Sequence, residues 1–119
     1  MRKAVLIVDD EPLVRLDIAE IIREGGFEPY EAANTAEAVA MLEAAPESFA
    51  AVITDIEMPG SRSGAVLANH ISHRWPTIRT IVISGGRKPL GGVLPYGTPF
   101  VSKPFSKRDI AAAISCTAA

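Results

Sequence analysis

The sequence has little of what marks a secreted, membrane-spanning or nucleic-acid-binding protein. Cys116 is the one cysteine among 119 residues, so no disulfide can form within the chain, which is usual in the reducing cytosol. The formal net charge is −2, whereas nucleic-acid-binding domains usually carry a basic surplus. No apolar run approaches the ~20 residues of a membrane span, and the run after Met1-Arg2-Lys3 stops at Asp9, too early for a signal peptide. We expect a cytoplasmic protein that binds neither nucleic acid nor membrane.

The sequence also lacks nucleotide-binding motifs. It has no GxxxxGK followed by Ser or Thr and no GxGxxG, so nucleotide binding has no support. What it does have is a hydrophobic content of 48%, which disfavours disorder. The length suits one α/β domain with a single core, and we expect that domain to span residues 1–119 without an output domain.

Two short apolar runs end abruptly in carboxylates. Val5–Val8 is followed by an acidic stretch that begins with Asp9 and Asp10, and Ala51–Thr54 is followed by Asp55. Such runs are typical of buried strands in a parallel sheet, whose ligands bind at the carboxyl ends of the strands. If both strands are central, the three aspartates converge there and repel one another unless a cation lies among them. Oxygen ligands favour Mg²⁺ or Mn²⁺.

Predicted strands and helices alternate along the chain, which indicates a doubly wound parallel sheet. A first helix begins at Pro12 and ends at Gly25-Gly26. The other predicted helices are Ala36–Ala45, Ala65–Arg74 and one completed by Ile110–Ser115. The strand that ends at Thr54 begins at Phe49, and the other predicted strands are Phe27–Ala32 at an edge, Thr80–Ser84 and Phe100–Ser102. Capping patterns mark two helix starts, at Asn34 with Glu37 and at Ser106 with Asp109.

One interval breaks this alternation. Between Ser84 and Phe100 the sequence contains five glycines and three prolines, a composition that hardly sustains a regular helix. We expect an irregular loop with at most one helical turn around Gly91–Leu94. The fourth helix of the fold would then be short or missing.

Polar residues follow four of the predicted strands: Asp9-Asp10, Asp55, Ser84 and Lys103. Each alone is common in a solvated turn or a helix cap, but their joint occurrence in this order is specific. The chain resembles, over nearly its whole length, the receiver domain of two-component response regulators. The resemblance rests on four segments: Val8-Asp9-Asp10-Glu11-Pro12, Asp55-Ile56-Glu57-Met58-Pro59-Gly60, Ile83-Ser84-Gly85 and Lys103-Pro104-Phe105.

The resemblance implies a flavodoxin-like (CheY-like) α/β fold, with a five-stranded parallel sheet in the order 2-1-3-4-5. It implies that Asp55 is the phosphoacceptor and that Lys103 and Ser84 bind the phosphoryl group. Ser84 and Phe100 fall on the family's switch positions, and the bond before Pro104 is expected to be cis. Such a site works mainly by positioning and charge neutralisation, because phosphoryl transfer needs little covalent work from the protein.

The resemblance also implies a metal site and a phosphoryl donor. Mg²⁺ or Mn²⁺ would be held by Asp10, Asp55 and the backbone carbonyl of Glu57, with Asp9 acting through water. The donor would be a histidine kinase or a histidine phosphotransfer protein, whose helices we expect to dock on Val14, Ile18 and their neighbours. The downstream protein target is open, and we expect a monomer or weak dimer. The domain would not be an enzyme beyond catalysing its own phosphorylation and dephosphorylation.

Three features differ from the usual family pattern. The segment Gly85–Thr98 is shorter and richer in Gly and Pro, so we expect phosphorylation of Asp55 to order Gly85–Gly97. Phe100 lacks the hydroxyl of the commoner tyrosine, so it is either a switch that acts by packing or a plain core residue. Glu57 puts an acid beside the phosphorylation site, where it either slows or assists hydrolysis.

Two other functions stay open. The chain could be a degenerate receiver that binds a partner without phosphorylation, although the intact polar positions disfavour this. It could also be a small phosphatase of the haloacid-dehalogenase type, but that family needs a second Asp where Glu11 or Glu57 stands. His70 and His73 are either metal ligands, phosphoacceptors or, as we favour, solvated helix positions.

Overall fold

The computed structural model describes residues 3–56, 64–85, 94–95 and 97–118. Five strands form one parallel sheet in the order β2-β1-β3-β4-β5, as predicted. The strands are β1 (Ala4–Val8), β2 (Glu28–Ala32), β3 (Phe49–Asp55), β4 (Arg79–Ser84) and β5 (Phe100–Ser102). The described residues also form four α-helices and a 3₁₀ turn: α1 (Pro12–Glu24), α2 (Thr35–Ala44), η1 (Pro46–Ser48), α3 (Gly64–Arg74) and α4 (Lys107–Ala118).

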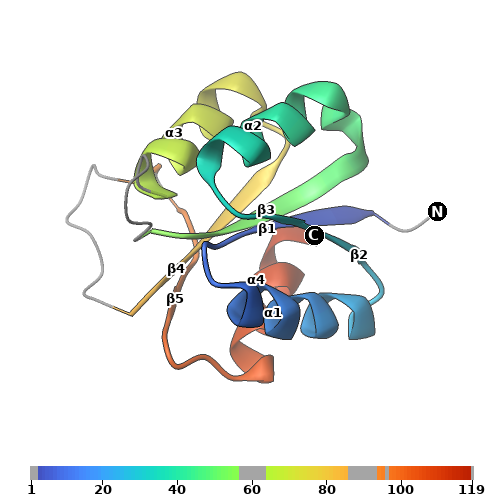
Figure 1. Cartoon of the computed structure of the whole chain (residues 1–119), viewed down its shortest axis with the longest axis vertical. Helices are drawn as coiled ribbons and strands as arrows, with labels where there is room; N and C mark the ends of the chain where they lie inside the picture. The colour runs from blue at the N-terminus through green and yellow to red at the C-terminus, as the bar shows by residue number, and fades with distance from the viewer. Residues whose placement is uncertain (1–2, 57–63, 86–93, 96, 119) are drawn as a thin grey trace.

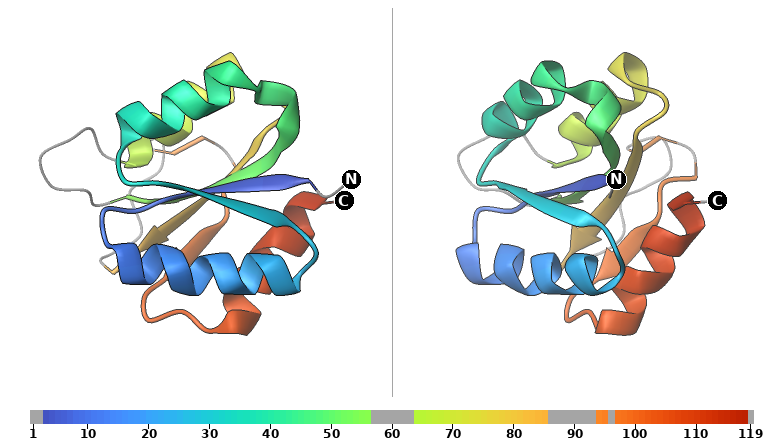
Figure 2. Two further views of the ribbon diagram at one scale, coloured as in Figure 1. Left: turned by 45° about the vertical axis from the view of Figure 1, so that its right-hand side comes forward. Right: turned by 90° about the vertical axis from the view of Figure 1, so that its right-hand side faces the viewer.

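The sheet lies between two layers of helices. Helices α1 and α4 cover one face, and α2 and α3 cover the other (Figures 1 and 2). No α-helix is described between β4 and β5, although the predicted turn at Gly91–Leu94 lies outside the described residues except for Leu94. The doubly wound architecture predicted from the alternation of strands and helices is confirmed.

The central strand β1 shows how one apolar run supports two cores. All five of its residues are buried, and successive side chains point to opposite faces. Leu6 and Val8 join the cluster under α2 and α3. Val5 and Ile7 join the cluster under α1 and α4. Burial on both faces explains why the sequence is uninterruptedly apolar until Asp9.

Helix α1 presents a different apolar face from the one expected to dock a kinase. Ile18 is 1% exposed and belongs to the core, and Val14 packs against that core. Ile18 is therefore unavailable to a partner, and that part of the prediction is wrong. Val14 is half-buried, so its docking role stays a prediction. The exposed apolar residues of the helix are Leu13, at 80%, and Leu16, at 52%.

The predicted caps are present, with one difference. At α4 the Asp109 N–H donates to Ser106 Oγ at 3.1 Å, and the Ser106 N–H donates to Asp109 Oδ2 at 2.9 Å. This is a reciprocal capping box. At α2 the Glu37 N–H donates to Asn34 Oδ1 at 2.9 Å, but the Glu37 carboxylate accepts from the Ala33 N–H, one residue earlier than in the standard box.

The sheet brings four strand ends to one edge. Val8 pairs with Thr54, Asp55 pairs with Ile83, and Ser84 pairs with Ser102. All of these strands run in the same direction, so the residues that follow them collect on the carboxyl side. Among the residues described, no helix is both long and apolar enough to cross a bilayer.

Candidate phosphorylation site

Three aspartates meet where β1 and β3 end. Asp9, Asp10 and Asp55 each offer a carboxylate oxygen, and these oxygens all lie within 4.8 Å of one another. Asp9 and Asp55 are buried, at 1% and 6% exposure, whereas Asp10 is exposed. The site therefore has two acids at its base and one at its mouth, as the strand ends predicted.

Lys103 brings a positive charge into this cluster. Its Nζ lies 2.9 Å from Asp55 Oδ2, with which it forms a hydrogen bond, and 3.6 Å from Asp9 Oδ2. The Lys103 N–H also donates to the Ser84 carbonyl at 2.8 Å, which ties the residue to the end of β4. The peptide bond to Pro104 is cis, as predicted.

Burial and the neighbouring charges shift two pKa values in the site. Burial raises the pKa of Asp9 to about 6, against the opposing effects of the Glu11 N–H and Lys103, while the neighbouring aspartates raise it further. Burial lowers the pKa of Lys103, but the hydrogen bond and charge of Asp55 outweigh it, so this pKa lies above its usual value. Lys103 thus stays charged but offsets only part of the acidic charge.

The donor set suits a hard divalent cation. Three carboxylates supply oxygen ligands alone, which is the chemistry that Mg²⁺ and Mn²⁺ prefer. The raised pKa of Asp9 shows that burial and the neighbouring acids disfavour its charged form, and a bound cation would reverse that balance. Asp9, Asp10 and Asp55 therefore fit the metal site that the sequence predicts. The expected third ligand, the Glu57 carbonyl, lies outside the described residues.

Ser84 and Phe100 lie at the predicted places in the sheet. Ser84 is the last residue of β4 and is 1% exposed. Phe100 is half-buried at the start of β5, where it pairs with Val82, two residues before Ser84. Their roles in a switch stay predictions, because one structure shows one arrangement.

The sequence over residues 5–115 matches the family described as the response regulator receiver domain. The chain belongs to this family. It is 44% identical over 82 residues to the NtrX-like response regulator of Rickettsia bellii (strain RML369-C), which covers 68% of this chain. The chain spans 17% of that relative's length.

Solved receiver structures share the fold. A response regulator receiver protein from Sinorhizobium medicae WSM419 superposes with a TM-score of 0.87 and 24% identity, covering 98% of this chain and 94% of its own. The response regulator protein TrrA from Thermotoga maritima, in complex with Mg²⁺-BeF, gives a TM-score of 0.82 and 28% identity, covering 97% and 98%. This chain is therefore a response regulator receiver of phosphorelay signalling.

In this receiver a glycine closes the back of the site. The N–H of Gly64, the first residue of α3, donates to the Ile56 carbonyl at 3.0 Å. A Cβ built on Gly64 would lie 2.1 Å from the Asp55 carbonyl oxygen and 2.7 Å from Ile56 Cα. The first turn of α3 therefore packs directly on the backbone of the proposed phosphoacceptor. The helix predicted from the sequence begins one residue later, at Ala65, and the glycine itself is the only sequence signal for this contact.

Arg15 is a site residue that the sequence reasoning missed. Helical spacing put it on the polar face of α1, yet its side chain is 15% exposed and its Nη1 donates to the Asp9 carbonyl at 2.6 Å. The available signal was its position. An arginine on the first turn of a helix that starts directly after a strand can reach back to the end of that strand.

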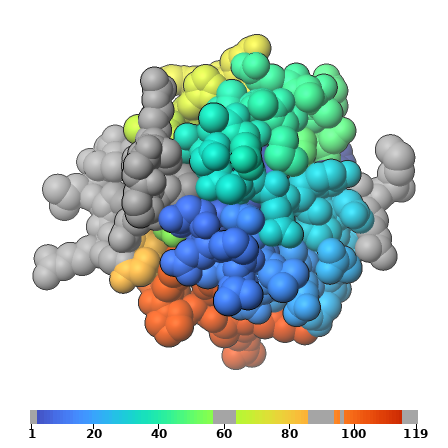
Figure 3. All heavy atoms as spheres, viewed as in Figure 1, coloured from blue at the N-terminus to red at the C-terminus, as the bar shows by residue number. Residues whose placement is uncertain are grey.

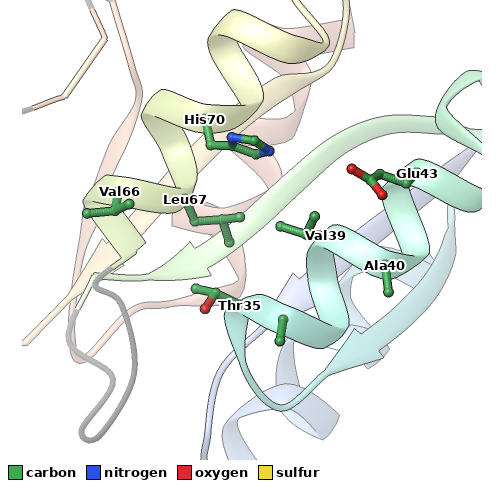
Figure 4. Close-up of a pocket in the computed structure, with 8 residues that line it drawn as sticks. Thr35, Val39, Ala40, Glu43, Val66, Leu67 and His70 are labelled. Carbon is green, nitrogen blue, oxygen red and sulfur yellow. The ribbon is translucent and has the colours of Figure 1, made fainter.

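The receiver also has an apolar cavity of about 510 Å³ between α2 and α3. Figure 4 shows Val39 of α2 and Leu67 and His70 of α3 projecting toward it from both sides. His70 is exposed, and its ring packs edge-on against Trp75 at 5.8 Å. Within the described part of the chain, the aspartates form the one cluster of three or more metal-ligating side chains. The preference for His70 as a solvated helix position agrees with its exposure.

Proposed function

We propose that Asp55 accepts a phosphoryl group from a phosphohistidine on a histidine kinase or histidine phosphotransfer protein, in a Mg²⁺-dependent reaction. One observation carries the proposal. A buried aspartate at the carboxyl edge of the sheet lies 2.9 Å from a lysine Nζ and shares a carboxylate cluster with two further acids. Asp55 therefore lies between the positive charge of Lys103 and two further carboxylates that could bind a cation.

The chemistry follows from this arrangement. A carboxylate oxygen of Asp55 forms the new P–O bond while the P–N bond breaks, and the electron pair of that bond goes to the imidazole nitrogen. Lys103 offsets the negative charge on the phosphoryl oxygens, and the Ser84 hydroxyl donates a hydrogen bond to one of them. A cation bound by Asp9, Asp10 and Asp55 supplies further charge neutralisation. Burial of Asp55 limits competing solvent.

The product is an acyl phosphate on Asp55, and its hydrolysis ends the signal. We infer that the protein catalyses its own phosphorylation and dephosphorylation only, rather than turning over many phosphate esters. The position two residues after Asp55 holds Glu57 instead of the second Asp of haloacid-dehalogenase-type phosphatases, which supports this reading.

Exposed apolar residues lie beside the site, where we infer that a helical partner docks. Leu13, at 80% exposure, and Leu16, at 52%, lie on the first turns of α1, just after Asp10. Figure 3 shows α1 (blue) as a large part of one face of the molecule. We propose that the phosphoryl donor docks there on these two leucines, rather than on the buried Ile18. The receiver would act as a monomer or weak dimer toward a downstream protein.

Phosphorylation would be transmitted through Ser84 and Phe100. Ser84 moves toward the phosphoryl group, and Phe100 turns into the vacated space. Residues 100 and 84 lie on neighbouring strands, so the movement has a short path. The predicted ordering of Gly85–Gly97 falls mostly outside the described residues and stays a prediction.

The test uses Mg²⁺ with acetyl phosphate, followed by intact mass, and beryllofluoride, followed by amide shifts. We expect a covalent phosphoryl adduct on the wild type and on Asp17→Asn, an exposed acid on α1, but none on Asp55→Asn. An adduct that survives in Asp55→Asn would refute the assignment. Absence of any adduct or shift would favour a degenerate receiver, and turnover of many esters would favour a phosphatase.

A further inference from the structure

Three hydrogen bonds fix the turn that carries the acids after β1. The Asp9 N–H donates to the Ala32 carbonyl at 3.2 Å, and the Glu11 N–H donates to Asp9 Oδ1 at 2.9 Å. The third bond runs from Arg15 Nη1 to the Asp9 carbonyl at 2.6 Å. Two of these donors belong to the backbone, whereas the third belongs to a side chain that substitution can remove.

Arg15 is itself held in place by the neighbouring strand. Its Nε donates to Glu31 Oε1 on β2 at 3.1 Å, and the side chains are 15% and 40% exposed. The guanidinium therefore spans two acceptors, one at the end of β1 and one on β2. A planar fork with several donors can do this, whereas the point charge of a lysine ammonium reaches one acceptor well.

We propose that Arg15 is a positioning residue for the cation of the phosphorylation site, and that Glu31 sets its orientation. The carbonyl that Arg15 holds belongs to the planar peptide joining Asp9 and Asp10. Holding that plane restricts the backbone positions from which both carboxylates reach the cation. Contacts of this kind, one step removed from the metal, typically change metal affinity 10–100-fold. The inference rests on the proposed function, because it presupposes a cation among these acids.

If Arg15 acted only through its positive charge, its removal would change Mg²⁺ affinity in the opposite direction. Arg15 places a positive charge beside the carboxylate cluster, so its removal would leave the site more negative and strengthen cation binding. Loss of the positioning bond would instead weaken binding. The direction of the change in Mg²⁺ affinity therefore separates the two roles.

The experiment titrates Mg²⁺ into metal-free protein by calorimetry. We expect Arg15→Ala to bind Mg²⁺ about tenfold more weakly than the wild type, and Arg15→Lys to fall between them because it keeps the charge but not both donors. Arg23→Ala removes the same charge from an exposed position on the same helix and should leave the affinity unchanged.

Glu31→Gln tests the second half of the proposal. We expect a smaller loss of Mg²⁺ affinity than in Arg15→Ala, and no additional loss when the two substitutions are combined. Affinity in Arg15→Ala equal to or tighter than wild type would overturn the proposal while leaving the proposed function intact. Failure of the wild type itself to bind Mg²⁺ would overturn both. If Arg15→Ala fails to fold by circular dichroism, unchanged affinity in both Arg15→Lys and Glu31→Gln overturns the proposal.

Discussion

Asp9 illustrates how a single residue can trade stability for a binding site. It is an acid at 1% exposure beside two other acids, and Lys103 lies 3.6 Å from one of its oxygens. Its carboxylate accepts a hydrogen bond from the Glu11 N–H. Burial without full compensation disfavours the charged form, which is the reason for its raised pKa.

We predict that Asp9→Asn stabilises the metal-free protein at neutral pH. The folded pKa of about 6 lies above the unfolded value of about 3.9, so the folded state binds the proton more tightly. The contribution of Asp9 is therefore most favourable below pH ~4 and is lost as the pH rises through ~6, a cost of about 2–3 kcal/mol at pH 7.5.

Urea unfolding with a chelator present, at pH 7.5 and at pH 4.5, measures this difference. Asp9→Asn should exceed the wild type in free energy of unfolding at pH 7.5, and the gap should shrink at pH 4.5. The Asn side chain can still accept from the Glu11 N–H, so the turn is preserved. A variant that is less stable than wild type at both pH values would contradict the electrostatic account.

Lys103 should affect phosphorylation and cation binding in opposite directions. Its Nζ hydrogen-bonds Asp55 and also lies near Asp9, so Lys103→Met removes both a phosphoryl-binding group and a charge that competes with the cation. We expect labelling by acetyl phosphate to fall by about tenfold or more and Mg²⁺ affinity to rise by calorimetry. Exposed Lys107, on α4, supplies the matched Lys107→Met control. Weaker Mg²⁺ binding in Lys103→Met would argue against this view.

At the scale of elements, the junction between β3 and α3 sets the shape of the site. Strand β3 ends at Asp55, and the first residue of α3 presses against the Asp55 carbonyl. The Ile56 N–H donates to the Ile83 carbonyl at 2.9 Å, so the chain leaves the sheet while still bonded to β4. The start of α3 and the end of β3 thus lie so close together that position 64 has no room for a side chain.

We predict that Gly64→Ala is strongly destabilising. Its Cβ would lie 2.1 Å from the Asp55 carbonyl oxygen, a backbone overlap that α3 can relieve only by moving away from the sheet. The expected loss is about 3 kcal/mol or more in the free energy of unfolding. Gly85→Ala is the matched control, because the contacts there are with Lys103 side-chain carbons at 4.0 Å. Equal stability of the two variants would show that α3 shifts at little cost.

At the scale of the whole molecule, the site depends on the complete sheet. Asp55 and Lys103 are 48 residues apart in the chain, yet their side chains are 2.9 Å apart. Their approach requires β3, β4 and β5 to be paired in register. A ligand that binds this constellation therefore binds the folded state and not the unfolded chain.

Mg²⁺ should accordingly raise the global stability of the receiver. At a concentration 100 times its dissociation constant, the expected gain in the free energy of unfolding is about 2.7 kcal/mol. Asp10→Asn should lose most of this gain, and because Asp10 is exposed its substitution leaves the core intact. Urea unfolding with and without Mg²⁺ makes the comparison. An equal gain in Asp10→Asn would place the stabilising ion elsewhere.

The fold and the convergence of the acids were predictable because apolar strands that end in polar residues can be recognised in the sequence. The unbroken apolar runs before Asp9 and Asp55 located two central strands, and their parallel order brought the acids together. Gly64 and Arg15 were not predictable in the same way. Periodicity assigns a residue to a face of its helix, whereas both contacts depend on how close that helix comes to a strand end. For the same reason Ile18 was misassigned as a docking residue.

The outer strand β2 has a consequence for self-assembly. It forms one edge of the sheet, and its sequence is Glu-Pro-Tyr-Glu-Ala. Pro29 offers no N–H to an incoming strand, and Glu28 and Glu31 would bring like charges face to face if two copies met there. Association of two copies edge to edge through β2 is thereby opposed.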